Sequence, residues 1–161
     1  MGQILTIYTI DNPFLRRKAV EVAELQDPEL AVLVENMLTT MLASDGVGIA
    51  APQVGQSLRL VIVASRPNPR YPDAPEMEPV IMVNPEIVGR SPALVQGLEG
   101  CLSVPGDKKM VIRHQTVEVC WHDLEAQRHY RSFSGFIARI VQHEIDHLDG
   151  ILYPDRAASS G

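Results

Sequence analysis

Apolar residues recur at helical spacing in an early segment of the chain. The repeat consists of Leu30, Leu33, Val34, Met37 and Met41. Residues three and four apart share one face of an α-helix, so the pattern predicts a helix whose apolar face packs on the core. Asp27 offers an N-cap and Pro28 suits the first helical position, while Gly46 or its neighbourhood ends the helix.

Three further segments have the composition or alternation of β-strands. Residues 58–64 and 80–83 are rich in Val, Ile and Leu, which predicts two buried strands. Residues 66–79 between them contain five prolines, which lack the N–H that helices and interior strands require, so we expect a surface loop there. Residues 116–122 alternate, which predicts a strand with Val117, Val119 and Trp121 on its buried face.

A last helix is predicted over residues 135–149. Ser134 can cap its start and Gly150 stands in the stop position. The elements together predict an α+β fold, in which mostly antiparallel β-sheets pack around a central C-terminal α-helix, with a second helix near the N-terminus.

Length and composition limit the classes of protein. With 161 residues, 45% of them hydrophobic and 21% charged, the chain is expected to form one domain over residues 1–161. The net charge of -6 argues against direct binding of nucleic acid. The sequence has no long apolar run, no secretory leader and only two cysteines, so we expect a bacterial cytoplasmic protein rather than a membrane or organelle protein.

Two histidines four residues apart, His143 and His147, lie in the last predicted helix with Glu144 between them. One helical turn advances about 5.4 Å, so both imidazoles can bind one ion from the same face. A metal ion lowers the pKa of bound water towards about 7, and Glu144 can take that proton and later deliver it to a leaving amine. The pattern favours a metal-dependent hydrolase over a helix that merely carries polar residues.

The third metal ligand must come from elsewhere, because catalytic sites of this type normally have three protein ligands. A metzincin would have a third histidine where this chain has Tyr153, and no glutamate follows His147 as a thermolysin-like site requires. Asp149 and Asp155 are weak candidates. We expect Cys101, because a thiolate with two imidazoles suits Fe(II), Zn(II), Ni(II) or Co(II), although an inert buried cysteine is the alternative.

A glycine-rich segment, residues 46–53, matches the dinucleotide pattern G-x-G-x-x-A. A predicted helix precedes it and Pro52 follows, which is the wrong context for a nucleotide site. Small residues would instead let an extended peptide approach Gly48, with the Gln53 amide and the Leu102 N–H as donors to an oxyanion. An alternative interpretation is equally well supported by this segment alone: its small residues would then serve only to form a tight connection between a helix and a strand.

Three segments together resemble the peptide deformylases: residues 46–53 (GVGIAAPQ), 99–103 (EGCLS) and 142–147 (QHEIDH). They occur in the family's order, and the similarity runs from the first predicted helix to the end of the chain. The resemblance implies removal of the formyl group from the N-terminal formyl-methionine of nascent peptides, with release of formate. It also implies one divalent metal ion, usually Fe(II), with Zn(II), Ni(II) or Co(II) as substitutes.

Specific roles follow from the positions within these motifs. The resemblance implies that the metal ligands are Cys101, His143 and His147. It implies Glu144 as the acid and base, and Gln53 with the Leu102 N–H as oxyanion donors. Gly48 should hydrogen-bond the substrate backbone. The pocket for the methionine side chain should be lined by Val47, Glu99 and Phe136.

The chain departs from the family pattern at three places. Many members have an arginine where this chain has Lys108 or Lys109, so peptide preference beyond methionine is left open. Arg139 stands where some members have an apolar pocket residue, although its aliphatic stem can still pack there. Many bacterial relatives end in a helix that contacts the ribosome, so we expect at most transient ribosome association without that helix.

Two other functions are compatible with the same residues. Cys101 could be the nucleophile of an amide hydrolase, with a histidine as its base. Alternatively the metal could be purely structural in a non-enzymatic module that binds peptides along the Gly48 edge.

Overall fold

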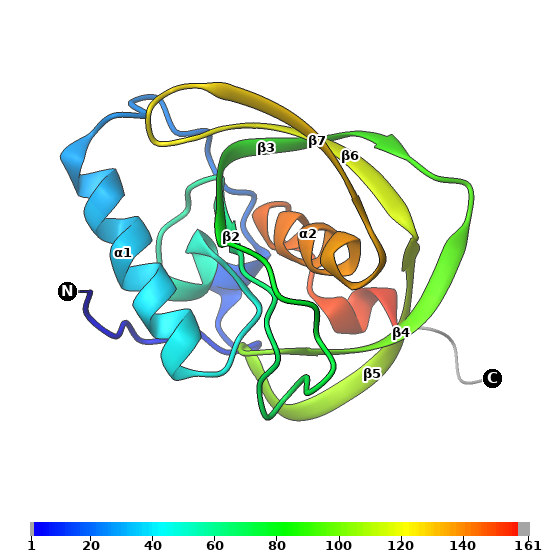
Figure 1. Cartoon of the computed structure of the whole chain (residues 1–161). Coiled ribbons are helices and arrows are strands. Elements are labelled where there is room, and N and C mark those ends of the chain that lie inside the picture. Colours follow the sequence, from blue (N-terminus) through cyan, green and yellow to red (C-terminus); the bar gives the residue numbers. More distant parts are fainter. Residues whose placement is uncertain (1, 158–161) are drawn as a thin grey trace.

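Helix α2 (Gly135–Leu148) lies at the centre of the molecule, surrounded by strands, in the computed structural model (Figure 1). The structure describes residues 2–157. A five-stranded antiparallel sheet has the order β1-β2-β3-β6-β7, and β4 pairs with β5 in a second antiparallel sheet. The predicted α+β fold, with antiparallel sheets around a C-terminal helix, is confirmed.

The strands of the larger sheet are β1 (Gly48–Ala50), β2 (Leu60–Val63), β3 (Val80–Arg90), β6 (Thr116–His122) and β7 (Arg128–Ser134). The smaller sheet contains β4 (Leu94–Cys101) and β5 (Val104–His114). Helix α1 (Pro28–Ala43) lies near the N-terminus. Three short 3-10 helices complete the chain: η1 (Pro13–Arg16), η2 (Ala51–Val54) and η3 (Tyr153–Arg156).

Strand β2 is buried on both faces because a helix covers each side of it. Val61 and Val63 belong to the core cluster that includes α2. Leu60 and Ile62 belong to the second cluster, which includes the apolar face of α1. Successive side chains of a strand point to opposite faces, so an uninterrupted apolar run is what this position requires.

Helix α1 begins as predicted. The Asp27 carboxylate accepts a 2.9 Å hydrogen bond from the backbone N–H of Glu29, and Pro28 occupies the first turn. The helix ends at Ala43, before Asp45 adopts a left-handed φ of 56°. Of the five apolar residues in the predicted stripe, Leu33 alone is half-buried and the other four are buried.

Helix α2 begins at the predicted residue and ends at Leu148, one residue before the predicted end, but the expected cap is wrong in one respect. Ser134 precedes the helix, yet its hydroxyl makes no capping bond and lies 2.9 Å from Thr116 Oγ1, in the neighbouring strand. Gly150 follows the helix with φ 75°, and a Cβ there would clash with the carbonyl oxygen of Arg16. A glycine is therefore needed at this stop position for two reasons.

Strand β3 extends to Arg90, beyond the predicted residues 80–83. The sequence pattern did not reveal this extension because the strand is irregular at Asn84. Asn84 has φ 52°, and its side chain accepts from Val22 N and donates to Val22 O. The pairing of β3 with β6 shifts register just after this point. In β6 the predicted alternation is confirmed, since Val117, Val119 and Trp121 are buried.

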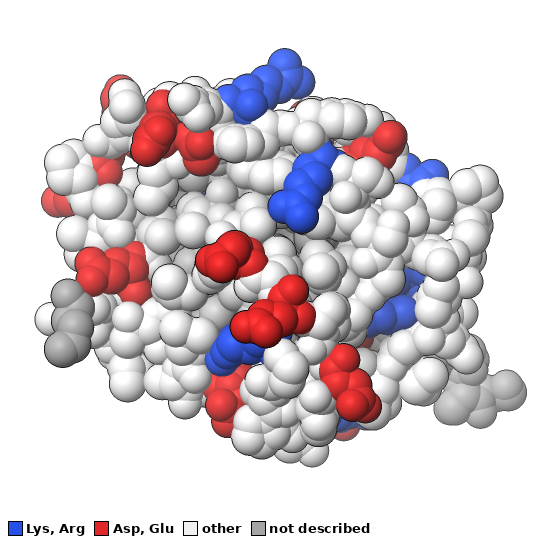
Figure 2. Space-filling model, in the orientation of Figure 1, with Lys and Arg blue, Asp and Glu red and all other residues white. Residues whose placement is uncertain are grey.

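Residues 66–79 contain no helix or strand, as their prolines predict. None of the helices within residues 2–157 is long and apolar enough to cross a membrane. On the face drawn in Figure 2, Lys and Arg side chains are scattered among acidic ones and do not gather in one patch. The tail after Ala157, where no ribosome-contacting helix is expected, lies outside the described residues.

Candidate active site

Three potential metal ligands meet where the end of β4 reaches the middle of α2. The side chains of Cys101, His143 and His147 each offer one ligand atom, and these atoms lie within 4.8 Å of one another. Cys101 Sγ is 3.4 Å from His147 Nε2. All three residues are buried, and β4 delivers the thiol to two imidazoles that the helix places on one face.

The surroundings of these residues fit a bound metal ion. One carboxylate oxygen of Glu144 and Nδ1 of His147 are buried and have no hydrogen-bond partner among the described residues. A buried polar atom without a partner is costly, so the Glu144 oxygen beside the three ligands indicates a group that completes the site. Nδ1 of His147 gives no such indication, because Nε2 is the atom of that ring that faces Cys101. A thiolate with two imidazoles is a donor set for iron or zinc.

His143 is oriented by a buried carboxylate. Its Nδ1–H donates to Glu99 Oε1 at 2.9 Å, which leaves Nε2 as the atom that can bind a metal. Burial opposes the charged form of this imidazole, but Glu144, Cys101 and Glu99 outweigh burial and raise the pKa of His143 well above its ordinary value. Burial lowers the pKa of His147, and the neighbouring His143 and Arg113 lower it further.

Glu99 is held by two arginines in addition to His143. Arg113 donates to both carboxylate oxygens at 2.9 Å, and Arg139 Nη1 donates to Oε2 at 2.7 Å. Burial opposes ionisation of Glu99, but the hydrogen bonds from Arg113 and His143 hold its pKa well below the usual range. Arg113 also donates to Asp146 at 2.6 Å, so one arginine links the two carboxylates.

Glu144 lies against the first strand of the sheet. Burial raises the pKa of its carboxyl group to about 7. A Cβ placed on Gly48 would lie 2.7 Å from Glu144 Oε2 and 2.8 Å from Ile140 Cγ2, so only a glycine allows this approach between β1 and α2. A carboxyl group with a pKa near neutrality can both accept and donate a proton.

The Gln53 side chain has a fixed orientation. Its Oε1 accepts from Ala50 N at 2.9 Å, so its Nε2 points towards the opposite wall, where it lies 3.0 Å from Ser103 Oγ and 3.5 Å from Cys101 Sγ. Gln53 is buried in η2, directly after β1. The structure therefore places an amide donor beside the candidate ligand, with Leu102 as a neighbour of both along the cavity wall.

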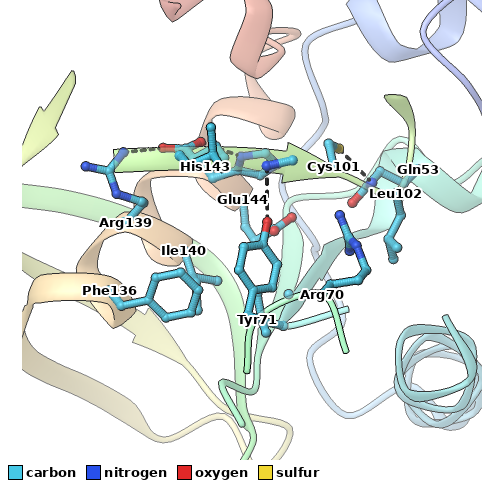
Figure 3. Close-up of a pocket in the computed structure, with 15 residues that line it drawn as sticks. Gln53, Arg70, Tyr71, Cys101, Leu102, Phe136, Arg139, Ile140, His143 and Glu144 are labelled. Atoms are coloured by element: carbon cyan, nitrogen blue, oxygen red, sulfur yellow. Dashed lines mark hydrogen bonds and ion pairs between the residues drawn. The ribbon is translucent and has the colours of Figure 1, made fainter. Parts of the chain in front are cut away.

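A cavity opens over this group of residues (Figure 3). It is bordered by each of the residues expected to contact the substrate, namely Gly48, Val47, Glu99 and Phe136. Phe136 and Arg139 lie at the end of the cavity opposite Gln53 and Leu102 (Figure 3). Glu99 borders the cavity, but its carboxylate is engaged by the arginines and His143.

Sequence reasoning missed several residues of the site. Ile140 lines the cavity, and its position four residues after Phe136 on α2 could have revealed it. Tyr71 and Arg70 reach the cavity from the proline-rich loop, where Tyr71 Oη accepts from Gly100 N at 3.1 Å. No local pattern marks these two residues, because the loop has neither helical nor strand periodicity.

Comparison with known proteins shows which family the chain is similar to. Residues 4–161 match the family model described as polypeptide deformylase. A protein named peptide deformylase 2 from Nostoc sp. is 51% identical over 158 residues, which cover 98% of this chain and 88% of that protein. The chain belongs to the peptide deformylase family.

Solved deformylases have the same fold. The class I type b enzyme of Acinetobacter baumannii, in a structure with Met-Ala-Ser bound, is 49% identical with a TM-score of 0.94 and covers 97% of this chain and 99% of that one. The deformylase of Thermotoga maritima is 32% identical to this chain, with a TM-score of 0.88. The match covers 98% of this chain and 100% of the Thermotoga chain. As a member of this family, the chain is a hydrolase that removes the formyl group from N-terminal methionine; the cysteine-nucleophile and binding-module alternatives are not favoured.

Proposed function

We propose that this chain is a single catalytic domain that hydrolyses the formamide of N-formylmethionyl peptides at the site formed by Cys101, His143 and His147. The observation that carries the proposal is the convergence of these three ligand atoms within 4.8 Å, beside the buried carboxyl of Glu144. We propose Fe(II) as the native ion, with Zn(II), Ni(II) or Co(II) as substitutes. When bound, the ion supplies Lewis acidity that polarises the formyl carbonyl and makes water a nucleophile near neutral pH.

Glu144 acts as the proton carrier in this proposal. It takes a proton from the attacking water and delivers the proton to the departing amine. Its pKa of about 7 supports both roles, because a group of this pKa gains and loses protons readily under cellular conditions. The carboxylate oxygen that lacks a partner among the described residues is available to accept from water.

Gln53 and the Leu102 N–H stabilise the negative charge that develops on the formyl oxygen. The Ala50 N–H fixes the Gln53 amide, so its donor end needs no reorganisation when the charge appears. Leu102 follows Cys101 directly, which puts its backbone N–H next to the metal ligand. Formate then leaves together with a free N-terminal amine.

The substrate lies along the edge of the larger sheet. Among the strands of residues 2–157, β1 pairs with β2 alone, so the backbone of Gly48 is available to pair with an extended peptide. Val47 and Phe136 line the pocket for the methionine side chain, and Glu99 shapes it by positioning its arginines. The bound Met-Ala-Ser in the Acinetobacter structure supports a peptide that begins with methionine.

The cellular setting stays a prediction. Two deformylases similar to this chain come from the bacteria Nostoc sp. and Shewanella oneidensis, which supports a bacterial cytoplasmic location. Newly made peptides would meet the enzyme during transient association with the ribosome.

An anaerobic assay of formate release from formyl-Met-Ala tests the proposal, with the metal content measured on the same sample. We expect formate from iron-loaded protein, none after chelation, and recovery when Fe(II) is added back. Parallel samples loaded with zinc, nickel and cobalt rank the substitutes. An iron-loaded sample that releases no formate would contradict the proposed activity.

A further inference from the structure

A second cavity lies against α2, beside helix residues that do not border the substrate cavity. Gln142 and Asp146 of α2 line it, together with the end of β3, the start of β4, the end of β5 and helix η3. It shares no lining residue with the cavity over the metal ligands. Its volume of about 230 Å³ is below the range of about 300–1,000 Å³ that is usual for drug-sized ligands, so it suits a smaller molecule.

The charges around this cavity favour an anion. Three arginines, Arg90, Arg113 and Arg156, border it together with one carboxylate, Asp146, so cations outnumber anions by two. The chain as a whole has a net charge of -6, so the arginines at this cavity are a local exception. A surplus of positive charge at a concave site raises the local concentration of anions.

Part of this positive charge is not used by the protein itself. Asp146 accepts from Arg113 Nη1 at 2.6 Å and from Arg156 Nε and Nη2 at 2.7 and 3.2 Å. These bonds leave Nη1 of Arg156 without a partner among residues 2–157. The guanidinium of Arg90 likewise makes no hydrogen bond or ion pair with the described part of the chain. Two arginines therefore have N–H donors available at the same cavity.

Apolar side chains border the cavity beside these donors. Ile87 is half-buried, whereas Leu94 is 58% exposed and Ile112 is 45% exposed. Ile112 pairs with Gln96 across the smaller sheet, so Leu94 and Ile112 are diagonal neighbours on one face of it. An apolar chain that lies on these side chains would remove their surface from water, which stabilises a bound ligand.

We propose that this cavity binds a small carboxylate that carries a short apolar chain. The carboxylate accepts hydrogen bonds from Arg90 and Arg156, whose planar guanidinium groups match its geometry. The chain lies on Leu94 and Ile112. Asp146 at the same cavity disfavours a doubly charged ligand such as phosphate, because like charges repel. A free fatty acid and the C-terminal residue of a peptide share this chemistry.

This inference goes beyond the proposed function and does not depend on it, because the ligand takes part in no step of deformylation. An NMR titration of the zinc-loaded, isotope-labelled full chain tests the site. Met-Ala-Ser amide is kept in excess, so that a peptide without a carboxylate fills the cavity over the metal. The probes are hexanoate, N-acetyl-leucine, acetate, phosphate and hexylammonium.

Hexanoate should shift the backbone amides of Ile87 and Ile112. We expect it to bind about tenfold or more tightly than acetate, because its longer chain covers apolar surface. It should also bind more tightly than phosphate. Hexylammonium has the same chain with the opposite charge and should not bind.

Substitutions test the two halves of the site separately. We expect Arg90→Met and Arg156→Met each to weaken hexanoate about fivefold or more, the usual effect of losing one hydrogen bond to a charged group. Leu94→Ala should weaken hexanoate about threefold or more and change acetate less than about twofold. Arg128→Met removes an exposed arginine of β7 that does not border the cavity, and this matched control should change neither affinity.

Several results would overturn the inference. Hexylammonium that binds as tightly as hexanoate would do so, and so would an unchanged hexanoate affinity in the R90M/R156M double variant. An equal loss in R128M would show a general effect of net charge, which also contradicts a defined site. Shifts confined to residues 100–103 would place hexanoate at the metal ligands instead. If R156M does not fold, R90M and L94A decide by the same affinities.

The two carboxylate sources are separated by the same titration. N-acetyl-leucine that binds more tightly than hexanoate would support a peptide C-terminus, and the reverse order would support a free acid. The assay of formate release is independent of both results. A protein that binds hexanoate at this cavity but releases no formate would contradict only the proposed function, and an active enzyme without this binding would contradict only the inference.

Discussion

The carboxylate of Glu99 accepts a 2.9 Å hydrogen bond from Nδ1 of His143. This contact fixes both the tautomer and the direction of the imidazole, so that Nε2 faces Cys101 and His147. A ligand held in this way loses little freedom when it binds a metal. The affinity of the site for its ion should therefore depend on a residue that is not itself a ligand.

Glu99→Gln tests this dependence. The amide keeps the size of the side chain but removes the charge, so His143 loses its anionic partner. We expect metal affinity to fall about 10- to 100-fold, the usual effect of changing such a partner. Competition with a chelating dye measures the affinity. Glu86→Gln, on the exposed side of β3, is the control, and an unchanged affinity in E99Q would show that this contact does not support the ligand.

Arg113→Met should destabilise the fold. Arg113 is buried between Glu99 and Asp146, and its loss leaves two carboxylates without their shared cation. We expect the free energy of unfolding to fall by about 3 kcal/mol or more. Urea denaturation of the metal-loaded protein measures it. Lys109→Met removes the cation of an exposed pair with Asp107 and should cost less than about 1 kcal/mol. Equal losses of unfolding free energy in the two variants would contradict the expectation that the buried cation contributes more than the exposed one.

Gly48→Ala should impair catalysis while the ligands remain intact. The new Cβ would lie 2.7 Å from Glu144 Oε2 and would displace the carboxylate from its position beside the site. A displacement of about 1 Å commonly costs about 100-fold in rate. We expect a loss of this size in kcat/KM, with metal content unchanged. Near-normal turnover in G48A would mean that Glu144 does not need the observed position.

Cys101 should react slowly with alkylating reagents when the metal is bound. Cys101 is buried, and its thiolate would be coordinated to the metal. Cys120 is half-buried, lies 3.9 Å from Arg128 Nη2 and serves as an internal reference. We expect alkylation of Cys101 to accelerate about tenfold or more after chelation, since coordination withdraws the reactive thiolate. Mass spectrometry of each cysteine peptide gives both rates. Equal Cys101 rates with and without metal would remove it from the ligand set.

Much of the framework could be predicted because it follows from local patterns. Three features could be recognised from residues that are close together in the sequence: the apolar stripe of α1, the Asp27 cap and the alternation in β6. The two histidines of α2 are one turn apart, so helical geometry alone brings them together. The place of Cys101 beside them rested on elimination and on the family resemblance, and the structure brings its Sγ within 4.8 Å of both histidine ligand atoms.

The smaller sheet could not be predicted from the same rules. Strands β4 and β5 leave many side chains exposed, including the apolar Leu94, Leu98 and Ile112, so the alternation of apolar and polar residues that marks a half-buried strand is weak. For the same reason the contacts of Arg113 and Arg139 with Glu99 were missed. Those contacts join residues 14 and 40 positions apart, and only the assembled sheet and helix bring them together.

Glu144→Ala is the most direct test of the central claim that this carboxyl group moves the proton in a metal-dependent deformylation. The variant retains Cys101, His143 and His147, so it should bind one metal ion as the wild type does. We predict that formate release from formyl-Met-Ala falls by about 100-fold or more at full metal occupancy, the range expected for loss of an acid and base. A fully loaded E144A protein with wild-type turnover would contradict the account.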